Sequence, residues 1–191
     1  MILVRHGQSA WNALFGETRV DPGIPDPALT PLGRDQAFAA GRRLAAGAGA
    51  RRISTLLASP YRRTLETAEI IAEVLGVAVT IEPLVRERAA FSCDTGSPRA
   101  ELVARWPHWD WARLEAERWW HECEHHGPES EDSVATRSAD FVARMVGHAA
   151  RSEVCVVTHW GFIRALTGQG VVNGALVPFD FSAARQGRFD F

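Results

Sequence analysis

Lysine is absent from this 191-residue sequence, and all 21 of its basic residues are arginine. We attribute this bias to a GC-rich genome rather than to function. The formal net charge is only -2, so the chain lacks the basic surplus that is typical of nucleic-acid-binding proteins. We therefore expect no nucleic-acid partner, although a local cationic pocket remains compatible with this balance.

Long apolar runs are also missing, and cysteine is scarce. No run reaches the roughly 18 residues that a membrane-spanning helix needs, and the opening MILV leads straight into polar residues, unlike a signal peptide. The three cysteines, Cys93, Cys123 and Cys155, are scattered, which favours a reduced compartment over a disulfide framework. We expect a cytoplasmic protein with no membrane partner.

The composition is that of an ordinary globular chain, with 46% hydrophobic and 23% charged residues. The length suits one domain and is short for two, so we expect a single domain over residues 1–191. Apolar strand-like segments alternate with helical patterns, one of which opens at Thr30-Pro31. The expected strands are 1–4, 53–58, 77–81 and 154–158, and the expected helices are 31–46, 60–75, 133–149 and 161–166.

This alternation predicts a three-layer α/β/α fold with a mostly parallel central sheet. The pattern breaks at about 85–132, which has no good strand and holds five of the seven tryptophans: Trp106, Trp109, Trp111, Trp119 and Trp120. We interpret it as an inserted helical cap, whose rings either form the cap's own small core or line a substrate entrance. The last stretch, VVNGALVPFDF, is a candidate edge strand or homodimer contact.

Cationic and imidazole side chains follow three of the expected strands. Arg5 and His6 come after the first, Arg62 and Arg63 after the second, and His159 after the fourth. Ligands of open α/β sheets bind beyond the carboxyl ends of the strands, so we expect these groups to meet at one edge. Such a set suits a doubly charged tetrahedral anion, because guanidinium groups match phosphate oxygens in paired hydrogen bonds. A GxxxxGK[ST] loop is missing, which argues against a nucleotide P-loop.

The segments around these residues resemble the motifs of the histidine phosphatase superfamily, which has a phosphoglycerate mutase-like fold. RHGQSAWN resembles the family's RHG motif, and DPALTPLGRDQA resembles its D-x-x-LT-x-x-G-x-x-QA segment. SPYRRTLETA is similar to SP-x-x-R-x-x-x-TA, GPESEDSVATR to the G-x-ES start of a helix, and VTHWGFIRAL to the second-histidine motif. The matches keep the family's order and span residues 3 to about 166.

The resemblance implies roles for particular residues. It makes His6 the nucleophile that becomes a phosphohistidine. It also implies that Arg5, Arg63 and His159 hold the phosphoryl oxygens and that Asn12 contacts one of them. A neutral imidazole is a competent nucleophile near pH 7, and nearby arginines disfavour its protonated form. Because the arginines supply the positive charge that phosphoryl transfer needs, we expect neither a metal nor a cofactor.

The leaving alkoxide needs a proton from a carboxylic acid at the mouth of the site. The resemblance places this acid soon after the third strand, where IEPLVRERAAF offers two glutamates. Glu87 fits the family's L-x-x-E spacing and is our choice for the proton donor. We interpret Glu82 as a solvated residue at the end of the strand, and Asp94 is a third candidate for the acid.

Three features depart from the family pattern. Gln8 stands where the family usually has glutamate, and Trp160 follows His159 in place of glycine. We interpret Trp160 as either a core residue or a wall of the substrate pocket. RERAAFSCDTGS replaces the segment that usually follows the acid, which leaves substrate specificity open.

HECEHH is a zinc-like pattern, with His121 and His125 four residues apart. Cys123 would lie on another face of a helix, and no second ligand cluster completes the set. We therefore interpret this stretch as an exposed turn rather than a metal site.

The sequence is compatible with three functions. The first is a metal-independent phosphatase that hydrolyses a small phosphorylated metabolite through phosphorylated His6. The second is a phosphoglycerate mutase, which would share the pocket but return the phosphoryl group to its substrate; the short chain without longer insertions favours hydrolysis. The third is a non-catalytic module that binds phosphorylated ligands.

Overall fold

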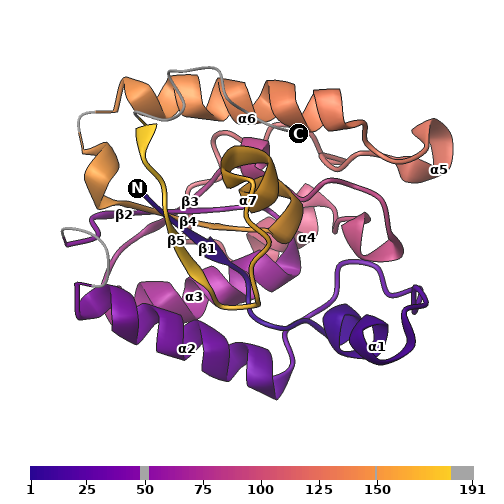
Figure 1. Ribbon diagram of the computed structural model, residues 1–191, viewed down its shortest axis with the longest axis horizontal. Helices are drawn as coiled ribbons and strands as arrows, with labels where there is room; N and C mark the ends of the chain where they lie inside the picture. Colours follow the sequence, from indigo (N-terminus) through magenta and orange to yellow (C-terminus); the bar gives the residue numbers. More distant parts are fainter. Residues whose placement is uncertain (48–51, 149, 182–191) are drawn as a thin grey trace.

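The computed structural model describes residues 1–47, 52–148 and 150–181 (Figure 1). Its strands are Ile2–Arg5 (β1), Thr55–Ala58 (β2), Val79–Ile81 (β3), Val154–Thr158 (β4) and Leu176–Pro178 (β5). They form one sheet in the order β3-β2-β4-β1-β5, in which β1 to β4 pair in parallel and β5 is antiparallel to β1. The prediction of a mostly parallel sheet is confirmed, and so is an edge strand within VVNGALVPFDF.

Two helical layers cover the sheet. The helices α2 (Pro31–Ala45) and α3 (Arg62–Leu75) lie on one face, and α6 (Glu131–Val146) and α7 (Trp160–Thr167) lie on the other (Figure 1). The strands divide their side chains accordingly, since Ile2 and Val4 join one core cluster while Met1 and Leu3 join the other. The three-layer α/β/α prediction is therefore confirmed. None of the described helices is long and apolar enough to cross a lipid bilayer.

The ends of the elements follow local sequence signals. Thr30 caps α2 by accepting a hydrogen bond from the Gly33 N–H, with Pro31 in the first turn. The helix expected over 133–149 begins two residues earlier and ends at Val146, and residue 149 lies outside the described residues. The helix α1 (Ala10–Thr18) was not expected from the sequence, although Ser9 and Asn12 form a capping box at its start.

The segment 85–132 is less helical than expected. It contains a 3₁₀ turn (Ser92–Asp94), α4 (Arg99–Arg105) and the short α5 (Cys123–His126), joined by loops. Two further 3₁₀ turns, Pro83–Val85 and Arg151–Glu153, precede this segment and β4.

The tryptophans of this segment do not form a core of their own, so that interpretation is wrong. Trp106, Trp111 and Trp119 are buried in the same cluster as Leu65 of α3 and Ile81 of β3. The physical reason is that the segment folds back along the edge of the sheet, where the Ile81 N–H donates to the Asp110 carbonyl at 2.9 Å. The rings thereby cover β3 and extend the main core.

Candidate active site

The two histidines meet because β1 and β4 pair in parallel. Arg5 is opposite Thr158 in this register, so the residues that follow them leave the same edge of the sheet side by side. The His6 N–H donates to the Thr158 carbonyl at 3.0 Å, and the ring centroids of His6 and His159 are 5.1 Å apart. Both side chains are buried. The predicted convergence of the two histidines at this edge is present, whereas Arg62 turns to Glu66 at 2.8 Å and is partly exposed.

The environment of His6 keeps its imidazole neutral. Nδ1 lies 2.7 Å from the Gly7 carbonyl, which can only accept a hydrogen bond, so Nδ1 carries the proton and Nε2 keeps its lone pair. Burial lowers the pKa of His6 well below its ordinary value, and the charges of Arg63 and Arg5 lower it further. A neutral imidazole with a free Nε2 is the form that can attack phosphorus.

Gly7 is required by close packing next to this histidine. A Cβ on Gly7 would overlap the carbonyl of Gly33, and a Cβ on Gly33 would overlap that of Gln8. The first turn of α2 therefore lies directly against the backbone that follows His6. Gln8 itself accepts a hydrogen bond from the Thr30 hydroxyl at 2.8 Å.

His159 has one ring nitrogen bound and the other without a partner. Nε2 lies 2.8 Å from the Ser59 hydroxyl, whereas Nδ1 is buried and has no hydrogen bond within the described part of the chain. Burial lowers the pKa of His159 well below its ordinary value, and the charge of Arg63 lowers it further. If the Ser59 hydroxyl donates to Nε2, then Nδ1 holds a proton that it can donate to an anion.

Sequence reasoning did not assign a role to Ser59. This residue directly follows β2, whose Ala58 is opposite Val157 of β4, and its N–H donates to the Val157 carbonyl at 3.1 Å. The strand order, with β4 between β1 and β2, is what brings Ser59 to His159. That order could not be read from the local pattern.

The two arginines supply the positive charge of the site. Arg63 is buried in the first turn of α3 and donates to the Cys93 carbonyl at 2.7 Å and to Asp94 Oδ1 at 3.0 Å. Arg5 donates from Nη1 to the Val171 carbonyl, while its Nε is buried without a partner among the described residues. Burial lowers the pKa of Arg5, but an arginine remains charged at neutral pH.

Glu87 lies within the electrostatic reach of both arginines. Its Oε1 accepts hydrogen bonds from the Gly161 N–H at 2.8 Å and from the Arg88 N–H at 3.0 Å. Burial raises the pKa of Glu87, and the charge of Asp94 raises it further, whereas Arg63 and Arg5 oppose the rise. A carboxyl group with a raised pKa retains its proton at higher pH, as a general acid requires.

The interpretation of Glu82 as a solvated residue is wrong. Its side chain is fully buried, and Oε2 accepts from Arg113 at 2.7 Å and from Arg144 at 2.6 Å. These two arginines are distant in the sequence, so local patterning could not reveal the pairing. Both bind the carboxylate, which makes Glu82 a structural anchor at the end of β3.

Asp94 is arranged as an acceptor rather than as a proton donor. Oδ1 accepts from Arg63, and Oδ2 accepts from the N–H groups of Ala90 and Phe91 at 3.0 and 3.1 Å. With both oxygens bound by donors, Asp94 does not fit the role of the acid. Its contacts therefore leave Glu87 as the better placed of the candidates.

The Asn12 side chain is partly occupied by the cap of α1. Its Oδ1 accepts from the Ser9 N–H at 3.1 Å and from Asn173 Nδ2 at 3.2 Å. The same Asn173 amide donates to the His6 carbonyl at 3.1 Å, which ties Asn12 to the nucleophile's backbone. The amino group of Asn12 is the end that remains for a phosphoryl oxygen, so this contact stays a prediction.

Two further features of the sequence are Trp160 and the HECEHH stretch. Trp160 is 39% exposed on α7, with the Arg164 guanidinium 5.3 Å from its ring, so the core interpretation is wrong. His121 precedes α5 instead of sharing a helical face with His125, and its Nε2 bonds to the Gly127 carbonyl. Across the described residues, no group of three or more His, Cys, Asp or Glu side chains is arranged to hold a metal ion.

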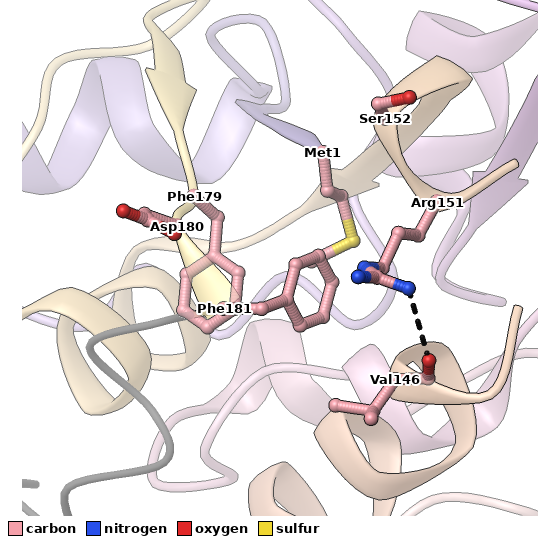
Figure 2. Close-up of a pocket in the computed structure, with 7 residues that line it drawn as sticks. All are labelled: Met1, Val146, Arg151, Ser152, Phe179, Asp180 and Phe181. Atoms are coloured by element: carbon pink, nitrogen blue, oxygen red, sulfur yellow. Dashed lines mark hydrogen bonds between the residues drawn. The ribbon is translucent and has the colours of Figure 1, made fainter. Parts of the chain in front are cut away.

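Several cavities are lined by none of the predicted catalytic residues. One of about 490 Å³ is lined by Trp119, Trp120 and neighbouring polar residues, namely Arg86, Arg118, His121, Glu122 and His126. Another of about 400 Å³ lies at the start of β1, the end of the strand opposite to His6. Figure 2 shows that Met1, Phe179 and Phe181 surround it and that Arg151 is held by the Val146 carbonyl. It contains none of the predicted catalytic residues.

Comparison with known proteins finds a family match over most of the chain. Residues 1–174 match the histidine phosphatase superfamily (branch 1). A glucosyl-3-phosphoglycerate phosphatase of Mycolicibacterium vanbaalenii is 34% identical over 174 residues, covering 87% of this chain and 72% of that protein. A solved structure of a mycobacterial glucosyl-3-phosphoglycerate phosphatase with inorganic phosphate has a TM-score of 0.59 at 26% identity, covering 92% of this chain and 86% of that one.

A mutase relative matches over a shorter stretch. The protein of Erwinia tasmaniensis named "Probable phosphoglycerate mutase GpmB" is 42% identical over 85 residues, which is 44% of this chain. The match spans only 36% of the length of that relative.

Proposed function

The chain belongs to the histidine phosphatase superfamily, and we propose that it is a metal-independent phosphatase that hydrolyses small phosphomonoesters through phosphorylated His6. The observation that carries the proposal is the buried, neutral His6 imidazole, which Arg5 and Arg63 influence electrostatically and His159 contacts. Positioning and positive charge are the main requirements of phosphoryl transfer. The two arginines supply that charge without a metal ion.

In the first step, His6 Nε2 attacks the phosphorus of the ester. The N–P bond forms as the bond from phosphorus to the ester oxygen breaks, and the arginines neutralise charge on the remaining oxygens. Glu87 gives its proton to the departing alkoxide, which leaves as an alcohol. The raised pKa of Glu87, due first to burial and then to Asp94, supports this role.

In the second step, water hydrolyses the phosphohistidine. Glu87, now a carboxylate, takes a proton from the water as its oxygen bonds to phosphorus and the N–P bond breaks. Inorganic phosphate leaves, and His6 returns to its neutral form. Splitting the reaction in this way replaces one difficult step by two easier ones.

The unfilled donors around the histidines support binding of the phosphoryl group. Arg5 Nε and His159 Nδ1 are buried polar atoms without a protein partner among the described residues. Buried polar atoms are nearly always hydrogen-bonded, so an orphaned pair beside a nucleophile favours a bound anion. We assign these two donors, together with the remaining N–H groups of Arg63, to the phosphoryl oxygens.

The substrate is proposed to be a small phosphorylated metabolite. The phosphatase relatives act on glucosyl-3-phosphoglycerate by name, so phosphorylated hydroxy acids and their glycosides are the first compounds to test. The tryptophan-rich segment is proposed to select among these substrates, because the Trp119 ring packs on Tyr61, whose ring in turn lies against Arg63. Three free cysteines favour a cytoplasmic location, and the edge strand β5 is the proposed homodimer contact.

The test compares wild type with His6→Ala on an aryl phosphate and on this panel. We expect turnover by the wild type, unaffected by EDTA, and none above background for the variant. His148→Ala is a matched control, because His148 is exposed beyond the end of α6 and should leave turnover unchanged. Undiminished turnover by His6→Ala would contradict the proposal, and wild type that binds phosphate without turnover would indicate a binding module.

A phosphoglycerate mutase is the second candidate, favoured by the 42% identity to the mutase relative over 85 residues. The two activities differ in whether water or the substrate accepts the phosphoryl group. Incubating the enzyme with 3-phosphoglycerate, with and without a bisphosphorylated primer, separates them. Isomerisation faster than phosphate release would establish the mutase.

A further inference from the structure

We propose that Asp94 is a positioning residue that holds the Arg63 guanidinium in place for the phosphoryl group, an inference that rests on the proposed phosphatase activity. Asp94 is 2% exposed and lies in the 3₁₀ turn Ser92–Asp94. It is not part of the four-residue set that the sequence motifs indicated. The structure places its carboxylate against Arg63, the arginine that is proposed to bind the anion.

The hold on Arg63 is an ion pair within a fixed turn. Asp94 Oδ1 accepts from Arg63 Nη2 at 3.0 Å, and the neighbouring Cys93 carbonyl accepts from Nη1 at 2.7 Å. The turn therefore occupies one edge of the guanidinium. An arginine has further N–H donors beyond these two bonds, so the other edge remains for the phosphoryl oxygens.

Asp94 is itself held firmly. The N–H groups of Ala90 and Phe91 donate to Oδ2, and the Tyr61 hydroxyl donates to the Asp94 carbonyl at 2.7 Å. The Tyr61 ring also lies 4.5 Å from the centre of the Arg63 guanidinium. Carboxylate, guanidinium and ring thus fix one another, which limits the movement of Arg63 in the absence of substrate.

Asp94 also acts on the proton of Glu87 through charge. The charge of Asp94 raises the pKa of this carboxyl beyond the effect of burial, whereas the charges of Arg63 and Arg5 lower it. The N–H groups of Arg88 and Gly161 donate to Oε1 and also favour the ionised form. Without Asp94, two guanidinium groups would act on Glu87 with no opposing charge, and the carboxyl would ionise at lower pH. Asp94 therefore both anchors Arg63 and offsets the lowering of the Glu87 pKa by the Arg63 charge.

The test uses Asp94→Asn, which removes the charge and keeps the side-chain shape. We would measure kcat against pH with an alkyl phosphate and the affinity for inorganic phosphate by calorimetry. The alkaline limb of the profile is the fall of kcat at high pH, where Glu87 loses its proton. Without the charge of Asp94 this limb should move to lower pH by about one unit. Phosphate affinity should fall about tenfold because Arg63 is less fixed. In Asp94→Asn combined with Glu87→Gln, the alkaline limb should be absent, as in Glu87→Gln alone.

Asp21→Asn is the matched control. Asp21 accepts from the N–H and hydroxyl of Ser92, so it anchors the same turn without touching Arg63. We expect both the limb and the phosphate affinity to stay at wild-type values in this variant. An equal change in Asp21→Asn would reduce Asp94 to a loop anchor and overturn the inference.

Failure of the Asp94 proposal can be distinguished from failure of the proposed phosphatase activity. An active Asp94→Asn enzyme with the wild-type limb and phosphate affinity would overturn the inference. If this variant does not fold, Asp94→Glu decides: it keeps the charge, so the limb should stay while phosphate affinity falls, and an unchanged affinity would contradict the hold on Arg63. Wild type that hydrolyses no ester would defeat the proposed function, whereas the calorimetric comparison would still test that hold.

Discussion

Two regions with buried charged and polar groups contrast in this protein. In the candidate site, Arg5 Nε and His159 Nδ1 are buried without protein partners among the described residues. The second region is the Glu129–Arg137 pair, which lies between the segment after β3 and the helix α6. Both oxygens of its carboxylate accept hydrogen bonds. Glu129 accepts from Arg137 Nε at 2.9 Å, from Arg137 Nη2 at 3.0 Å and from the Ser133 hydroxyl at 3.0 Å.

Arg137 and Arg5 differ in how many of their hydrogen-bond donors the protein itself uses. The remaining N–H groups of Arg137 donate to the carbonyls of Leu84, Arg86 and Glu87, at 2.7 to 3.1 Å. The Glu129–Arg137 pair therefore holds the backbone that carries the proposed acid, and it has little capacity for a ligand. Each region holds a buried donor without a partner among the described residues, since Arg86 Nε beside Glu129 is also unpaired. The candidate site differs because its unpaired donors accompany the neutral His6 imidazole, whose Nε2 is free to attack.

The largest effect should come from breaking the Glu129–Arg137 pair. Arg137→Met leaves Glu129 buried without its partner, so we expect the free energy of unfolding to fall by about 3–5 kcal/mol. Urea titration followed by tryptophan fluorescence measures this loss. Arg42→Met, at an exposed position of α2, should change it by less than about 0.5 kcal/mol. A loss below about 1 kcal/mol for Arg137→Met would contradict the structural role.

The same pair should make the fold sensitive to acid. Burial alone would raise the pKa of Glu129, but the hydrogen bonds and charge of Arg137 outweigh it and lower the pKa. A carboxylate with a lowered pKa stabilises the folded protein above its unfolded pKa, and this contribution is lost as the pH falls through the folded pKa. Unfolding curves should thus show stability decreasing below the ordinary glutamate range in wild type, with a smaller decrease in Arg137→Met.

Glu87→Gln should affect chemistry more than stability. We expect kcat to fall about 100-fold or more with an alkyl phosphate, and less with an aryl phosphate whose leaving group needs no proton. The alkaline limb of the pH profile should also disappear. Glu82→Gln provides the contrast, because it disturbs the pairs with Arg113 and Arg144 and should not alter the leaving-group dependence. Equal kcat losses on both esters in Glu87→Gln would contradict its role as the acid.

The smallest effect is expected at Asn12. Asn12→Ala removes half of the capping box of α1, so the free energy of unfolding should fall by about 1 kcal/mol. Ser130→Ala removes the cap of α6 and should cost a similar amount. If Asn12 also contacts the phosphoryl group, only Asn12→Ala should raise KM. An unchanged KM would restrict Asn12 to capping.

These contrasts also show how far the sequence could predict the molecule. Apolar runs and helix caps located β1, β4 and α2, and the rule for parallel sheets brought His6 and His159 to one edge. Both inferences rest on local patterns or on general topology. The family motifs then supplied the roles of Arg5 and Arg63, which patterning alone did not give.

The remainder depended on contacts between distant segments. The local sequence predicts Glu82 to be a solvated residue at the end of the strand. It is buried because Arg113 and Arg144, which lie 31 and 62 positions away, both bind its carboxylate. The burial of Trp111 and Trp119 likewise required the loop to fold back on β3. Helix α1 was missed although its signal, Ser9 with Asn12 three residues later, was present.

Trapping the phosphorylated enzyme tests the central proposal most directly. Wild type and His6→Ala would be mixed with a ³²P-labelled phosphomonoester, quenched within one turnover in alkali, and mapped by proteolysis and mass spectrometry. We expect an acid-labile, alkali-stable phosphate on His6 in the wild type and no labelled protein in the variant. A wild-type enzyme that turns over without labelling His6, or a variant labelled to the same extent, would contradict the role of His6 as nucleophile.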